Sequence, residues 1–186
     1  MNLKYAKLIL LAFLLIPNAK SAETLFLYQG TLNRKINIDE LYEFQRTKIP
    51  SRKLKNIMKI TNQNEKDLFN ILSYEIEVPL KSSSRLLKSQ IGEVFLERLS
   101  KIIHPNKISD KNIGKKAIRS GIILSSYNNN EKINLIDFFK AYPNKNIAIN
   151  IGSLRKTLKK AESLKELIKF YSNSPFKKLK EGSSSI

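Results

Sequence analysis

Two short apolar stretches separated by a turn form the first regular pattern downstream of residue 22. Residues 24–28 are apolar and aromatic, and Gln29-Gly30 follows them as a turn signal. Residues 35–38 then alternate polar with apolar side chains, which is the period of a strand with one buried face. Together the two stretches predict a small N-terminal β-hairpin.

Helical periodicity dominates the rest of the chain and predicts a mainly α, single compact helical domain. Apolar residues recur at intervals of three and four, which places them on one face of a helix. Residues 82–103 carry this spacing on both sides of Gly92, and we expect two helices hinged there and closed by Pro105. Residues 147–150 are brief, extended and β-branched. The other helices are predicted from Asp39 to just before Pro50, at 51–60, at 63–72, from Ser109 or Asp110 to 128, at 135–139 and at 153–171.

The first residues of the chain resemble an export signal. Lysines precede an apolar run at residues 8–16, and a proline and small residues follow it. Residues 1–21 are therefore predicted to be a signal peptide that is cleaved after Ser21, so that the mature chain begins at Ala22. The run is shorter than the roughly 20 apolar residues that span a bilayer, which favours cleavage over a permanent signal-anchor. The expected location is the periplasm, the thylakoid lumen or the extracellular space.

The formal net charge is +18, from 34 basic and 16 acidic residues. Residues 22–77 carry nine basic and eight acidic side chains, whereas residues 78–186 carry 22 and eight. Such an excess is typical of proteins with a polyanionic partner. For an exported protein this partner is lipid headgroups, lipopolysaccharide or an acidic protein, and no nucleic acid is expected. The alternative is a compositional drift toward Lys, Ile and Asn that an A+T-rich coding sequence produces.

The basic amphipathic helix predicted at residues 153–171 has two interpretations. Its apolar stripe either docks on an anionic membrane or a partner, or it closes the domain core while its lysines face water. Two glutamates interrupt its basic surface, which favours the second interpretation. Residues 172–186 are polar and are predicted to be a flexible tail. The candidate contacts with an anionic surface are Lys115, Lys116, Arg155, Lys156, Lys159 and Lys160.

Candidate catalytic chemistry is sparse. The sequence contains no G-x-S-x-G nucleophile elbow, Gly-rich phosphate loop or His/Cys metal-binding spacing, so no catalytic residue, cofactor or metal site is predicted. His104 is the sole histidine, and as the residue before a proline it is interpreted as a loop residue rather than a triad member. Ser153 and Lys156 satisfy S-x-x-K, but Ser153 is better explained as a helix cap. Glu75 and Glu77 share one face if their segment is extended. They then form either an acid–base pair or a solvated strand edge.

Three groups of residues, in this order along the chain, resemble a known family. They are Leu25-Phe26-Leu27-Tyr28-Gln29-Gly30 with the segment from Ile36 to Phe44, then Leu86-Leu87 with the segment from Ile91 to Ile102, and finally Ala117-Ile118-Arg119 with residues 133–138, 142–143 and 147–150. Through these motifs residues 23–167 resemble the cyanobacterial domain of unknown function 1400. That domain is an exported helical region usually found N-terminal to a predicted α/β-hydrolase.

The resemblance implies a hydrolase-associated helical domain at residues 22–171, in a chain without the elbow serine of the hydrolase part. We therefore expect no enzymatic activity, and an exported accessory domain that binds or regulates a separately encoded α/β-hydrolase or another envelope protein. One alternative is a peripheral binder of anionic envelope lipid through the basic C-terminal surface. A minor alternative is a stand-alone hydrolase. The lysines at 115–116 and at 156–160 depart from the family pattern.

Overall fold

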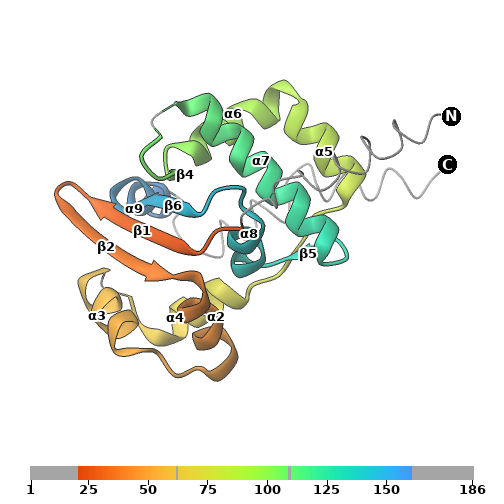
Figure 1. The fold of residues 1–186 in the computed structure, drawn as a ribbon. Coiled ribbons are helices and arrows are strands. Elements are labelled where there is room, and N and C mark those ends of the chain that lie inside the picture. The colour runs from red at the N-terminus through yellow and green to blue at the C-terminus, as the bar shows by residue number, and fades with distance from the viewer. Residues whose placement is uncertain (1–20, 62, 109, 161–186) are drawn as a thin grey trace, which may run out of the picture.

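The computed structural model describes residues 21–61, 63–108 and 110–160, and a four-stranded mixed sheet lies among its helices (Figure 1). The strands follow the order β2-β1-β6-β4. β1 (Thr24–Gln29) and β2 (Leu32–Asn37) form the predicted antiparallel hairpin, which is confirmed. β6 (Asn146–Asn150), which the β-branched pattern indicated, lies parallel to β1.

The last strand of the sheet, β4 (Ile103–Pro105), corrects the prediction that this segment closes a helix. It pairs antiparallel with β6, and β6 therefore lies between β1 and β4. Proline is tolerated here because β4 is an edge strand, where a missing N–H costs no ladder bond on the open side. The hairpin is thus half of a sheet whose other half comes from much later in the chain.

The remaining structure is mainly α, as predicted. Short polar side chains at the starts of several helices accept backbone N–H groups that the first turn leaves without a helical partner. These capping residues are Asn64, Ser89, Asp110, Asn134 and Asn150. The helices are α2 (Ile38–Thr47), α3 (Arg52–Thr61), α4 (Glu65–Ser73), α5 (Leu80–Lys88), α6 (Gln90–Ser100), α7 (Lys111–Asn128), α8 (Leu135–Ala141) and α9 (Ile151–Lys160).

At two helix starts, α6 and α9, a capping side chain explains why the boundary differs from the predicted one. The break between α5 and α6 lies at Ser89 rather than at Gly92, because Ser89 Oγ accepts the N–H of Gly92 at 3.2 Å and so begins α6. Gly92 is needed for close packing instead, since a Cβ there would lie 2.1 Å from the Leu86 carbonyl oxygen. α9 begins two residues earlier than predicted, and its cap is Asn150, whose Oδ1 accepts the N–H of Ser153 at 2.9 Å.

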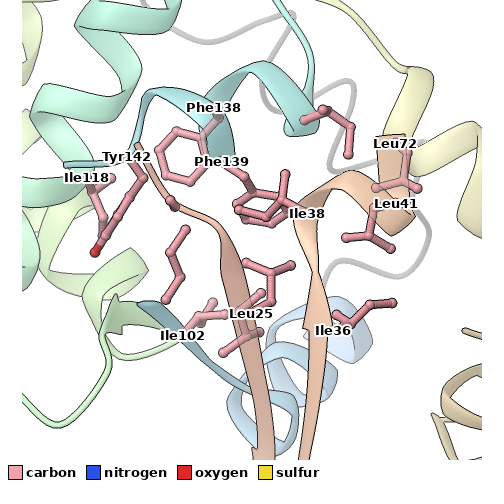
Figure 2. Close-up of a cluster of buried hydrophobic side chains, with 14 of the residues drawn as sticks. Leu25, Ile36, Ile38, Leu41, Leu72, Ile102, Ile118, Phe138, Phe139 and Tyr142 are labelled. Atoms are coloured by element: carbon pink, nitrogen blue, oxygen red, sulfur yellow. The ribbon is translucent and has the colours of Figure 1, made fainter. Parts of the chain in front are cut away.

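The core lies where one face of the sheet meets α8 and the helices on either side. α2, α3 and α4 lie toward the β2 edge of the sheet, and α6 and α7 lie toward the β4 edge (Figure 1). Leu25 and Ile36 come from the hairpin, Phe138 and Phe139 from α8, and Ile118 from α7 (Figure 2). α8 packs on α7 and also on α2 and α4, so it joins the two groups of helices.

A second, two-stranded sheet lies away from the first. β3 (Ile76–Glu77) pairs antiparallel with β5 (Lys132–Ile133), and Glu77 stands opposite Lys132. The buried hydroxyl of Ser126 donates to the Val78 carbonyl oxygen at 2.6 Å, which ties this segment to α7. None of the helices in the described part of the chain is long and apolar enough to cross a membrane.

Three predicted segments lie largely outside the described residues. Of the predicted signal peptide, residues 1–21, only Ser21 is described. The predicted C-terminal helix is described as far as Lys160, and the predicted tail, residues 172–186, lies beyond it. These three predictions stay predictions.

Candidate functional site

The six cations predicted to meet an anionic surface lie on two helices. α7 carries Lys115 and Lys116, whereas α9 carries Arg155, Lys156, Lys159 and Lys160. The side chains of the last two lie outside the described part of the chain. The two groups therefore have to be considered separately.

On α7, Lys115 is engaged within the fold. Its Nζ donates to Glu93 Oε2 on α6 at 3.1 Å, and Arg119 forms an ion pair with the other carboxylate oxygen. Arg119 also donates to the Leu87 carbonyl oxygen at 3.1 Å from Nη2. The hydrogen bond from Lys115 is the main cause that lowers the pKa of Glu93. Desolvation opposes it, and the hydrogen bond from Arg119 adds to it. Of the predicted pair on α7, Lys116 is the exposed cation.

On α9, Arg155 joins three elements. Its Nη2 donates to the carbonyl oxygen of Thr61, the last residue of α3, at 2.9 Å. Its Nη1 donates to Gln29 Oε1, at the end of β1, at 3.3 Å. Since a guanidinium has five N–H groups, these two bonds hold α9 to α3 and the hairpin without exhausting its donors. The next residue, Lys156, is exposed.

His104, the sole histidine, lies in β4 rather than in a loop. Its Nδ1 is 3.0 Å from the Pro105 carbonyl oxygen, which can only accept, so Nδ1–H donates to it. Its Nε2 is 2.8 Å from the hydroxyl of Tyr28 on β1, and the two groups form a hydrogen bond. The two rings meet edge to face, with centroids 5.8 Å apart. Sequence reasoning missed this pair, because it spans 76 positions and crosses over β6.

The other candidates for chemistry lie on separate elements. Glu77 belongs to β3, and exposed Glu75 directly precedes that strand. Ser153 lies in the first turn of α9, with Lys156 one turn further along. Within the described residues no group of three or more His, Asp or Glu side chains is arranged to hold a metal ion. The carboxylates thus lie on β3 or directly before it, the histidine on β4 and the serine on α9.

A shallow hollow opens where the hairpin, α3 and α9 meet. It encloses about 40 Å³. Pockets for small molecules enclose roughly 300 Å³ or more, so this hollow is a contact surface rather than an enclosing site. Tyr28, Gln29 and Thr61 contribute to its wall. Its apolar lining is Leu27, Leu32, Ile57, Ile60 and Ile151, and its two cations are Arg34 and Arg155.

Every element around this hollow lacks acidic residues. β2 carries two Lys or Arg residues, α3 carries four and α9 carries four, and neither these elements nor β1 contains Asp or Glu. The net charge summed over residues 22–77 does not reveal this absence, because the acidic residues of that segment lie on other elements. An element-by-element count of charge is the sequence signal that finds the site.

A family model described as "Alpha/beta hydrolase of unknown function (DUF1400)" matches residues 21–150 of the chain. The match covers all four strands of the larger sheet and ends at Asn150, directly before α9. No curated protein and no solved structure matches the chain.

Proposed function

The chain belongs to the DUF1400 family of alpha/beta hydrolases of unknown function, and from this membership we propose that it is an exported, non-catalytic accessory domain. In this proposal it binds a separately encoded α/β-hydrolase and regulates it. The proposal takes the class of partner from the hydrolase in the family description. The residues of the chain supply the reason to place catalysis on the partner.

The hydrogen bonding of both His104 ring nitrogens is the observation that carries the proposal of a non-catalytic domain. An α/β-hydrolase triad needs a serine on an elbow turn and a histidine that takes its proton. The sequence has no elbow motif, no cysteine and one histidine. Both ring nitrogens of that histidine are engaged, by Tyr28 and by the Pro105 carbonyl oxygen. A serine nucleophile activated through His104 would have to displace Tyr28, so this geometry does not favour a stand-alone hydrolase.

The contacts of Ala22 and Glu23 are compatible with cleavage after Ser21 and export. Ala22 is buried, and the Glu23 N–H donates to the Lys145 carbonyl oxygen at 2.9 Å. Cleavage after Ser21 would leave these contacts and the whole sheet intact. The expected result is a chain beginning at Ala22 in the exported fraction, measured by intact mass spectrometry. A chain that retains Met1 in the cytoplasmic fraction contradicts export.

Capture of the partner tests the function. The tagged chain is crosslinked mildly in its source organism, and the captured proteins are identified by mass spectrometry against an unrelated bait of equal net charge. The expected result is selective enrichment of an exported hydrolase that carries G-x-S-x-G. The purified pair should then show a change of at least about twofold in ester hydrolysis relative to the hydrolase alone. Absence of any such hydrolase above the charge-matched bait overturns the proposal.

The non-catalytic part of the proposal has its own test. The purified chain alone is expected to hydrolyse no member of a broad ester panel above a buffer control. Hydrolysis that is present in the unaltered chain and lost in His104→Ala would contradict it. Tyr28→Phe serves as the control, because it removes the hydroxyl from Nε2 and would expose rather than delete a catalytic histidine.

A further inference from the structure

We propose that the hollow between the hairpin, α3 and α9 is a docking surface for an anionic lipid bilayer. In this arrangement Leu32 and Ile60 enter the interfacial layer, and the surrounding cations meet lipid phosphates. The proposal does not depend on a hydrolase partner, since it concerns the surface on which the domain rests. It also moves the membrane contact away from α7, where Lys115 is paired with Glu93.

Exposed apolar side chains are the first argument. Leu32 is 54% exposed and Ile60 is 48% exposed, and both line the hollow. Leu32 directly follows the two-residue turn of the hairpin, so it stands at the tip of a projecting element (Figure 1). Burying such residues in the headgroup and acyl boundary removes apolar area from water, which is how peripheral proteins gain affinity for a membrane.

The charge around these apolar residues is the second argument. Arg34 lines the hollow, Lys59 precedes Ile60 on α3, and Lys156 follows Arg155 on α9; the side chains of Arg34, Lys59 and Lys156 are exposed. No acidic residue occurs on any of the four surrounding elements. Cations within and next to an exposed apolar centre complement a surface that is anionic outside and apolar within.

The polar groups of the hollow point to a lipid surface rather than to an acidic protein. The Thr61 carbonyl oxygen and the Gln29 side chain already accept from Arg155. The lining therefore offers charge and apolar area. It offers few free hydrogen-bonding groups in a fixed geometry, which is what the recognition of a particular protein side chain needs. A fluid layer of phosphates over acyl chains needs no such geometry.

A single tryptophan reports insertion at this surface directly, because the chain contains no tryptophan of its own. Leu32→Trp places the probe at the hairpin tip. Ile91→Trp on α6, where the native side chain is 69% exposed, is the matched control. Each full-length variant is titrated with phosphatidylglycerol vesicles and with phosphatidylcholine vesicles, and emission wavelength and quenching by doxyl-labelled lipid are measured. Binding alone is not the readout, because the apolar run at residues 8–16 would carry any variant to a vesicle.

The expected result is a shift to shorter wavelength and lipid quenching for Trp at position 32 on anionic vesicles, and neither for Trp at position 91. In the Leu32→Trp chain, Arg34→Gln and Lys59→Gln should each raise the lipid concentration at half-maximal shift about fivefold, and Lys116→Gln should not. Raising the ionic strength from about 0.1 M to about 1 M should weaken the shift.

Two outcomes overturn the proposal. Equal shifts at both positions, or no shift at position 32 with phosphatidylglycerol, would show that the hollow does not meet the bilayer. A shift at position 32 with soluble polyglutamate but not with vesicles would assign the surface to an acidic protein. Matching thermal unfolding curves for the two Trp variants exclude loss of fold as the cause of either result.

Discussion

Tyr142 is the largest of the fully buried side chains, and its hydroxyl has no hydrogen-bond partner among the described residues. Its ring packs edge to face on Phe138, with centroids 5.7 Å apart, on the side of the core where Ile118 lies (Figure 2). Burial raises the pKa of Tyr142, so the phenol stays neutral. A buried hydroxyl without a partner costs free energy that a hydrogen bond would otherwise return.

Tyr142→Phe should therefore stabilise the domain. The substitution keeps the ring and removes only the desolvated oxygen, so the free energy of unfolding is expected to rise by about 1 kcal/mol. Urea denaturation of the two chains measures it. Tyr127→Phe is the control, because Tyr127 is 71% exposed and should change nothing. A loss of stability in Tyr142→Phe would show that the hydroxyl has a partner, such as a buried water.

Single residues were the level at which sequence reasoning was weakest. The pattern identified His104 as the sole histidine and favoured a loop residue, yet the residue lies in a strand and bonds Tyr28. Likewise Arg155 was predicted to contact an anionic surface, which stays a prediction, while its bonds to Gln29 and Thr61 were not foreseen. Both partners come from distant positions, and local spacing carries no information on contacts that only the assembled sheet creates.

At the scale of elements, the contact between α6 and α7 depends on one carboxylate. Glu93 of α6 accepts from Lys115 and is paired with Arg119 of α7. The same arginine also bonds the end of α5 through the Leu87 carbonyl oxygen. Arg119 of α7 therefore bonds both α6, through Glu93, and the end of α5.

This tie should weaken in acid. The pKa of Glu93 is held below its ordinary value of 4.5, chiefly by the hydrogen bond from Lys115. A carboxylate with a lowered folded-state pKa stabilises the fold above its unfolded pKa, and that contribution is lost as the pH falls through the folded-state value. Glu93→Gln should thus be less stable than the unaltered chain near neutrality, and the difference should shrink between about pH 5 and about pH 3.

Urea denaturation of both chains across this pH range measures the difference. Glu75→Gln is the control, since Glu75 is an exposed carboxylate away from these helices. A difference between Glu93→Gln and the unaltered chain that stays constant down to about pH 3 would contradict the role of the Glu93 charge.

Helices and the hairpin were predictable because their signals are local. Apolar spacing, capping residues and prolines lie within a few positions of the structure they specify. The errors were also local competitions: Ser89 caps α6 where Gly92 was expected to be the hinge, and Asn150 caps α9 where Ser153 was expected. The short strand β4 was assigned to a helix end, because three residues are too few to show a period of two.

At the scale of the whole molecule, a charge summed over half the chain does not show how the charge is distributed among the elements. Residues 22–77 are nearly neutral in sum, so the sequence predicted the anionic contacts among the cations of α7 and α9. In the fold, the acid-free helix α3 and strand β2 from that segment lie beside α9 and form one basic surface around the hollow. The family resemblance was confirmed over residues 21–150, but it carries no such surface information.

The sheet unites the two groups of helices, since β6 pairs with β1 on one side and with β4 on the other. Ile147 of β6 is fully buried at this junction. Ile147→Ala removes buried methyl groups from the centre and should lower the free energy of unfolding by about 3 kcal/mol. Ile49→Ala is the control, because Ile49 is 74% exposed and should cost little.

The same variant tests whether the domain unfolds as one unit. If the strand joins both halves, Ile147→Ala should lower the urea midpoint equally for peptides of α2–α4 and for peptides of α6–α7, as measured by hydrogen–deuterium exchange with mass spectrometry. Coincident transitions are the mark of a single cooperative unit. Two separate urea midpoints, with only the sheet and one group of helices shifted, would show that the two halves fold independently. The stability of β1 and β4 would then not depend on β6 between them.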